Sequence, residues 1–250
     1  MILQVGPQNE EEFRALCEND ALGTRMYATY LAYGNETPGV GFWLAPGLCL
    51  GQTDDTLTIC GLPGEEQLEE LAGFLQMLGV RTVVCAPAAA EKLHLHTLAR
   101  GEAMVRPGEG EVLPCGGYAR AEALQLRRLC GFLQRCETES FRAPEPDGFY
   151  LDFSHRVRHL AADGELLLRN GETAACALAG AVTETDALIS AVAVLPEYRR
   201  QGLGREAVLA LCTRLGGRRC HVLRAENENE AFYRSMGFVP HGEWVEGAVR

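Results

Sequence analysis

The chain has 250 residues, of which 47% are hydrophobic and 23% charged, and its formal net charge is -11 at pH 7. This length and apolar fraction suffice for one large domain or two ordinary ones, and they exclude disordered, collagen-like and low-complexity chains. Because affinity for phosphate backbones comes from lysine and arginine, 23 basic residues against 34 acidic ones argue against a nucleic-acid partner.

Targeting and redox signals indicate a cytoplasmic protein. The start, MILQVGPQNEEEF, has no basic region and no apolar core of a secretion signal. No run approaches the roughly 20 apolar residues of a membrane span, so no membrane partner is expected. The 10 cysteines never form CxxC, which favours buried thiols in a reducing compartment. The histidine pairs His94 with His96 and His155 with His159 lack HExxH or clustered carboxylates, so no metal site is predicted.

Charge and turn signals divide the chain into two predicted domains. Residues 1–108 carry 14 acidic and 6 basic residues, whereas residues 109–250 carry 20 and 17. The turn-rich segment 106–110 separates them, and a new apolar segment, EVLPCGGYAR, follows at 111–120. We therefore expect domains at 1–108 and 109–250.

The first domain shows an alternation of apolar segments and turns between residues 40 and 87. Apolar strands are expected at 41–52 and 57–64, with a polar turn at 52–55 between them. A helix follows at 65–79, and another apolar strand at 80–87.

The second domain shows a clearer pattern. Helices are predicted at 121–136 and 147–160, and a hairpin joins strands 164–169 and 172–182 because Asn170-Gly171 supplies the positive φ angles of a type I′ turn. A turn at 183–186 leads into the continuous apolar strand 187–195. A glycine-containing loop, helix 204–215, strand 219–225, helix 229–236 and strand 237–244 follow. This order predicts an α/β domain with a mixed sheet.

The loop between strand 187–195 and the next helix has the features of an anion site. Gly202 and Gly204 let a ligand approach the backbone, and the helix start leaves N–H donors unpaired. Arg199, Arg200 and Arg205 add cations suited to a diphosphate. A dinucleotide fingerprint fails at its third glycine, and a Walker loop needs a lysine that this loop lacks. The alternative interpretation, a glycine turn that only begins a helix and binds no ligand, is also compatible with this pattern.

The wider pattern resembles the GNAT superfamily of acyl-CoA-dependent N-acetyltransferases over roughly residues 110–250. Its pyrophosphate-loop motif is matched by Pro196, Arg199, Gly202 and Gly204. Its end motif, of the FYxxxGF type, is matched by Tyr233, Gly237 and Phe238 in the segment 231–238. The resemblance implies a mixed central sheet flanked by helices and an acetyl-CoA cosubstrate.

The resemblance also implies a set of cofactor contacts. Backbone groups of Val192, Ala193 and Val194 would pair with the pantetheine arm as an added strand does. The diphosphate would lie on the loop formed by Arg199, Arg200, Gln201, Gly202, Leu203, Gly204 and Arg205. Either Asn227 or Asn229 would contact the cofactor, and the choice is open because the stretch to Tyr233 is about one residue longer than usual.

Tyr233 is the expected general acid. The leaving group of acyl transfer is a CoA thiolate, and a phenol with a reference pKa near ~10 can donate a proton to it. The alternative is a core tyrosine with a satisfied hydroxyl. Glu226 is the base we assign, with Glu184 and Asp186 as alternatives. All three also fit solvated carboxylates at loop ends, and in many family members the base works through water.

Residues 1–108 are interpreted as a degenerate GNAT-like domain in tandem with the second, with an unrelated α/β domain as the alternative. Leu62-Pro63 repeats Leu195-Pro196, but four glutamates, at 65, 66, 69 and 70, stand where the second half has arginines. These carboxylates would repel a diphosphate. This domain would shape the acceptor cleft or form an oligomer interface such as that of a homodimer.

The resulting hypothesis is an enzyme that moves an acetyl group from acetyl-CoA to a primary amine by direct attack in a ternary complex, without a metal. The acceptor is left open between small molecules and peptides. The net charge of -11 is compatible with a cationic acceptor, although it is also ordinary for a soluble protein. The alternatives are a non-catalytic acyl-CoA-binding regulatory module and a pure interaction protein.

Overall fold

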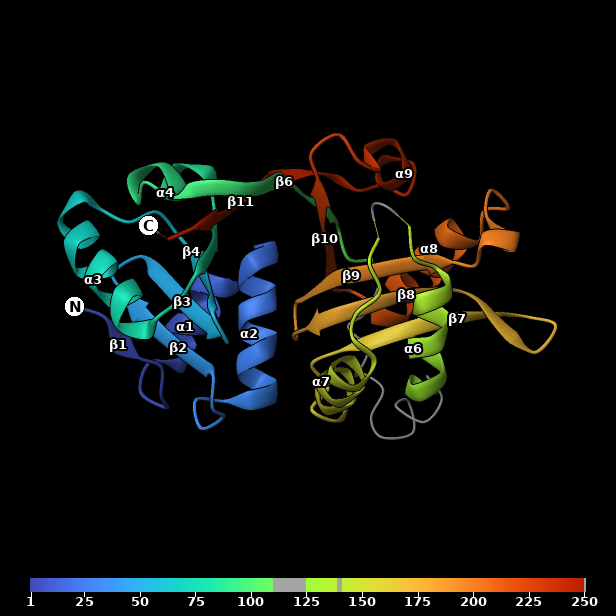
Figure 1. Cartoon of the computed structure of the whole chain (residues 1–250), viewed down its shortest axis with the longest axis horizontal. Coiled ribbons are helices and arrows are strands. Elements are labelled where there is room, and N and C mark those ends of the chain that lie inside the picture. Colours follow the sequence, from blue (N-terminus) through green and yellow to red (C-terminus); the bar gives the residue numbers. More distant parts are fainter. Residues whose placement is uncertain (110–124, 139–140, 250) are drawn as a thin grey trace.

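The residues that the structure describes form one continuous sheet of 11 strands with helices on its faces (Figure 1). The computed structural model describes residues 1–109, 125–138 and 141–249. The expected apolar segment 111–120, Cys115 and the first residues, 121–124, of a predicted helix lie outside the described residues. The strand order is β1-β2-β3-β4-β5-β11-β6-β10-β9-β8-β7.

The first part of the chain forms these elements: β1 (Leu3–Gln4), α1 (Glu10–Cys17), α2 (Ala21–Tyr33), β2 (Val40–Ala45), β3 (Leu48–Thr53), β4 (Thr56–Cys60), a 3₁₀ turn at Glu65–Gln67, α3 (Leu68–Leu78), β5 (Thr82–Cys85), α4 (Pro87–Lys92) and β6 (His96–Arg106). Strands β1 to β4 are antiparallel neighbours, and β4 pairs with β5 in parallel. The predicted strand 41–52 is a hairpin of two strands, β2 and β3, whereas the other predicted strands and the helix at 65–79 are present.

The second part repeats this order: α6 (Leu126–Arg135), α7 (Pro146–Arg158), β7 (Asp163–Arg169), β8 (Glu172–Val182), β9 (Asp186–Val194), a 3₁₀ turn at Pro196–Tyr198, α8 (Leu203–Leu215), β10 (Arg219–Ala225), α9 (Glu230–Arg234) and β11 (Val239–Ala248). Strands β7, β8 and β9 are antiparallel, and β9 pairs with β10 in parallel. Asn170 and Gly171 have φ of 53° and 81°, as the predicted type I′ turn requires.

Strands β6 and β11 are exchanged between the two parts and run side by side where the parts meet (Figure 1). β6 pairs with β10, and β11 pairs with β5. Met104 of β6 is fully buried in the core under α8, and Val245 of β11 is buried in the core under α3. β11 is longer than the predicted strand 237–244 because its last residues pair with β5. The domain boundary at 108/109 stays a prediction.

The helices cover both faces of each half of the sheet. α8 packs on β8, β9 and β10, whereas α6 and α7 pack on the opposite face. α2 lies between the two halves (Figure 1), and its Ala21, Ala28 and Ala32 share a small core with Ala181 and Leu188. Small side chains on this helix allow it to approach both halves closely. No helix within the described residues is long and apolar enough to cross a bilayer. The nine described cysteines are buried free thiols.

Candidate functional site

The site begins where β9 and β10 separate. The two strands pair only from Asp186↔Arg219 to Ile189↔Val222, whereas β8 follows β9 as far as Val194. Register shifts between β8 and β9 lie next to Ser190, at the residue where β10 leaves. Beyond Ile189, the edge of β9 that faced β10 has therefore lost its strand partner.

A cavity of about 750 Å³ occupies this gap. Its wall is formed by residues 190–194 of β9, by 198–200 and 202–205 of the following loop and helix, by Asn229, Phe232 and Tyr233 near α9, and by Cys136, Thr138 and Phe141. The structure thus brings together nearly all cofactor-binding residues that the sequence predicts, along with Tyr233. Gln201, Asn227 and Glu226 lie outside its described wall.

The loop before α8 has a backbone shaped for an anion. Arg200 and Gly202 both have positive φ, 63° and 82°, which turns successive N–H groups toward one concave side. α8 then begins at Leu203, and its N-cap, Gly202, offers no side-chain oxygen to the first-turn N–H groups. A diphosphate on these groups would take the place of the missing cap.

Gly204 faces the inside of the cavity. A Cβ placed there would lie 3.4 Å from Val194 Cγ2, 3.7 Å from Phe232 Cζ and 3.8 Å from Val192 Cγ1. One methyl group is tolerated at these contacts, but any longer side chain must enter the space between β9 and α9. The glycine therefore keeps the cavity open.

The three arginines of the loop have different surroundings. Arg199 donates to the carbonyls of Val194 (3.1 Å) and Cys136 (3.0 Å), so its guanidinium ties the end of β9 to the end of α6. Arg200 and Arg205 are exposed on the cavity wall, and within the described residues neither has an ion-pair partner. These two side chains are the ones that can reach a bound phosphate.

Tyr233 lies at the inner side of the cavity. Its ring packs edge-on against Phe232 and Phe238, with centroid distances of 5.1 Å and 5.5 Å. Burial raises the pKa of its phenol to about 12, so the hydroxyl carries its proton at neutral pH. Asn229 accepts the Tyr233 N–H on its carbonyl at 3.1 Å and also lines the cavity. Of the two candidate asparagines, only Asn229 is in place.

None of the three carboxylates considered as a base lines this cavity. Asp186 is buried at the opposite end of β9. Burial alone would raise the pKa of its carboxyl, but hydrogen bonds from Arg219, His221 and Thr185 hold that pKa well below its usual range.

The other two carboxylates are also engaged elsewhere. Glu184 is exposed and lies 3.8 Å from Arg14. Glu226 accepts from Arg100 Nε at 2.9 Å and lines a second cavity. The base is therefore not assigned by this geometry.

Some wall residues were not predicted. Cys136, Thr138 and Phe141 follow α6, and their place depends on how α6 and α7 pack on β8 and β9 rather than on a local pattern. The histidine pair on α7 has a packing role: His155 Nε2 donates to the Ala32 carbonyl at 2.7 Å. Its ring stacks on Tyr33.

The corresponding loop in the first half is closed by the chain itself. Lys92 on α4 donates from Nζ to the Pro63 carbonyl at 2.9 Å and lies 3.0 Å from the Glu65 carboxylate. Glu70, in the first turn of α3, pairs with the N-terminal amine of Met1 at 2.9 Å. In this loop the carboxylates are therefore paired with cations of the same chain. At the corresponding place, the second half has arginines exposed to a ligand.

The twice-repeated mixed sheet, with a cavity where its parallel strands separate, is a tandem GNAT fold. Residues 127–238 match the acetyltransferase (GNAT) family. The predicted fold class, a GNAT-like mixed sheet in tandem with a second GNAT-like half, is confirmed by the strand order and by the structures below.

Solved structures share this fold along almost their whole length. A GNAT-family acetyltransferase from Colwellia psychrerythraea aligns with a TM-score of 0.61 at 11% identity, covering 100% of each chain. A tandem GNAT protein from the clavulanic acid biosynthesis pathway aligns at 0.58 and 14%, covering 100% of this chain and 98% of its own. A GCN5-related N-acetyltransferase from Kribbella flavida aligns at 0.58 and 16%, covering 93% and 96%. No curated protein matches the sequence. At these identities the likeness is one of fold.

Proposed function

We propose that this protein is an acyl-CoA-dependent N-acyltransferase that moves an acetyl group from acetyl-CoA to a primary amine by direct attack in a ternary complex. The observation that carries the proposal is the cavity of about 750 Å³ between β9 and the start of α8. It joins three features that acyl transfer from CoA needs: an open strand edge, an anion-binding loop and a protonated hydroxyl.

Each feature has a role in holding the cosubstrate. The pantetheine arm pairs with the open edge of β9 at residues 192–194, as an added strand does. Its diphosphate lies on the N–H groups of residues 200–205, with Arg200 and Arg205 as cationic donors. Asn229 is the asparagine that contacts the cosubstrate, because it lines the cavity.

The chemistry requires one bond to form and one to break. The neutral amine nitrogen bonds to the thioester carbonyl carbon, the carbon–sulfur bond breaks, and the sulfur leaves with the bonding electrons. Tyr233 gives its proton to this thiolate, a role that a phenol with a pKa of about 12 can fill because it is neutral at working pH. The amine loses its own proton to water, since no candidate carboxylate lines the cavity.

The experiment compares two glycine-to-glutamate variants. Gly204→Glu places a carboxylate inside the cavity, whereas Gly73→Glu adds the same charge on the exposed face of α3, where a Cβ meets nothing within 4 Å. Calorimetry should show CoA binding to the wild type and to Gly73→Glu and its loss in Gly204→Glu, with circular dichroism unchanged in all three. Equal CoA affinity in all three proteins would refute the site.

Turnover then tests the activity. Acetyl-CoA should be consumed in the presence of at least one primary amine from a panel of small amines and peptides. CoA binding without turnover on any amine would point to an acyl-CoA-binding module, and absence of CoA binding to an interaction protein. A cytoplasmic location is part of the proposal, and the buried free thiols support it. A homodimer built on the first half stays a prediction.

A further inference from the structure

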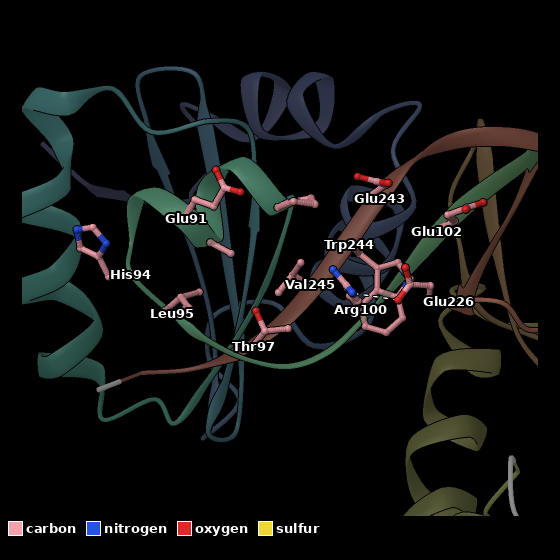
Figure 2. A pocket seen from close by; sticks show the side chains of 13 residues that line it. Glu91, His94, Leu95, Thr97, Arg100, Glu102, Glu226, Glu243, Trp244 and Val245 are labelled. Carbon is pink, nitrogen blue, oxygen red and sulfur yellow. Dashed lines mark hydrogen bonds and ion pairs between the residues drawn. The ribbon is translucent and has the colours of Figure 1, made fainter.

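A second cavity, of about 530 Å³, lies where the exchanged strands β6 and β11 pass α4 (Figure 2). Four glutamates line it: Glu91 on α4, Glu102 on β6, Glu226 after β10, and Glu243 on β11. A cavity of this size is within the range that holds small organic ligands. No local sequence pattern indicates this cavity, because its walls come from four separate elements.

Two of the four carboxylates are already neutralised by the protein. Glu226 is paired with Arg100 at 2.9 Å, and Glu102 accepts from the buried Arg224. Glu91 and Glu243 differ, because neither has a cation at ion-pair distance within the part of the chain that the structure describes. Figure 2 shows these two side chains on opposite elements, α4 and β11, beside the same opening.

The rest of the wall is mixed: His94, Thr97 and the Glu226-paired Arg100 are polar, and the other side chains are apolar or aromatic. Trp244 lies next to Glu243 in the chain, and its indole lines the cavity together with Leu95 and Val245 (Figure 2). An indole ring attracts cations through its electron-rich face, and this attraction grows where water is excluded. Unpaired carboxylates, an aromatic ring and an aliphatic floor are together suited to a ligand with both methylene groups and positive charge.

We propose that this cavity binds an organic cation between Glu91, Glu243 and Trp244, and that this cation is the remote charged end of the acceptor amine. The second part of this statement rests on the proposed acyl transfer. The first part concerns only a cation and this cavity, and it can be measured without acetyl-CoA.

The position of the cavity supports the link to the acceptor. Glu226 lines the second cavity and Asn229 lines the CoA cavity, so a turn of three residues separates them, about 11 Å of chain at most. The Arg224 side chain crosses the same boundary, because its Nη2 contacts Glu102 of the second cavity and lies 3.2 Å from Glu230 on α9, the helix that carries Tyr233. The acceptor we expect is therefore a polyamine whose reacting nitrogen and remote charge are separated by several methylene groups.

The test uses three probes: 1,4-diaminobutane, spermidine and agmatine. Binding is measured by calorimetry on the full chain, with and without saturating CoA. The neutral 1,4-butanediol and the anionic succinate serve as controls of similar length. Because the chain has only two tryptophans, Trp43→Phe leaves Trp244 as the sole indole, and its emission reports directly on the cavity.

We expect at least one cationic probe to bind once per chain and to change Trp244 emission, while the diol and the dicarboxylate do neither. Glu91→Gln and Glu243→Gln should each weaken the binding by up to about 5-fold, the upper end for an exposed ion pair. Glu12→Gln removes the same charge from α1, outside the cavity, and should leave the affinity unchanged. Raising the salt concentration should weaken binding to the wild type.

Several results would overturn the proposal. The first is that none of the three amines binds, with or without CoA. The second is that 1,4-butanediol binds as tightly as the amines. The third is that Glu12→Gln weakens amine binding as much as Glu243→Gln does. Failure of the proposed function would look different: the diamine binds and depends on Glu91 and Glu243, yet no acetyl-CoA is consumed. The opposite outcome is also possible to detect. If the enzyme acetylates a diamine but neither glutamine variant changes the KM for that diamine, this cavity is not the acceptor site, and the proposed acyl transfer still stands.

Discussion

Replacing Tyr233 by Phe removes a single oxygen atom from the CoA cavity. The ring contacts with Phe232 and Phe238, at 5.1 Å and 5.5 Å, are kept because they involve only the aromatic ring. The change therefore tests the hydroxyl without creating a void in the core. If the hydroxyl protonates the leaving thiolate, kcat should fall by about 10²- to 10⁴-fold, the usual contribution of a lost general acid. The KM for acetyl-CoA should change little.

The same variant tests the burial of the phenol through its pH dependence. The pKa is about 12 in the folded chain against 10.0 for an exposed tyrosine. Because the folded pKa is the higher one, the associated stability is complete below pH 10 and is lost as the pH rises toward 12. Its full size is roughly 2–3 kcal/mol, an upper bound for a difference of this kind. Tyr233→Phe should lack this loss and unfold less readily than the wild type between pH 10 and 12.

Two assays test this variant. One is turnover under conditions where chemistry limits the rate, and the other is urea unfolding at a series of alkaline pH values. Tyr150→Phe is the matched control, because Tyr150 lies on α7 outside the CoA cavity and stacks under Arg127. Wild-type turnover in Tyr233→Phe would show that the residue has only a structural role. An alkaline stability curve equal to that of the wild type would show that the phenol is not buried as described.

Three further outcomes follow from the structure. The full chain should bind one CoA in calorimetry, because the Lys92–Glu65 pair closes the loop of the first half, and a stoichiometry of two would contradict this. Gly202→Ala should cost about 1 kcal/mol of stability at its φ of 82°, lowering Tm by roughly 2–4 °C, and an unchanged Tm would argue against the strained turn. Asp186→Asn should cost about 1–3 kcal/mol by weakening the hydrogen bonds that Asp186 accepts from Arg219 and the buried His221. Because the pKa of Asp186 is lowered in the folded chain, the wild type has extra stability above pH ~4 that it loses on acidification. Asp186→Asn should lack this pH-dependent part, and acid unfolding of both proteins would measure it.

Local chemistry made much of the second half predictable from its sequence. The type I′ turn at Asn170-Gly171 and the glycine loop before α8 depend on φ angles that few residues other than glycine and asparagine adopt. The strand β9 could be placed because its apolar run is long and bounded by turns. These features need no information about distant parts of the chain.

The parts that could not be predicted depend on long-range geometry. The sequence left Asn227 and Asn229 equivalent, and only the fold of the turn before α9 brings Asn229 to the cavity. Glu226 was assigned as a base from its place at a strand end, but the side on which it emerges is set by the pairing of β10 with β6. No local pattern in the sequence indicates that β6 pairs with β10 and β11 of the second half.

The exchange of β6 and β11 also determines when the protein can complete its fold during synthesis. β5 is made early, but the strand that covers its edge, β11, is made after nearly all of the second half. Until then β5 has an unpaired edge, and the core beneath α3 lacks Val245. A nascent first half is thus an incomplete sheet with an exposed, aggregation-prone strand. Until β11 is made, the edge of β5 is therefore open to pairing with other chains.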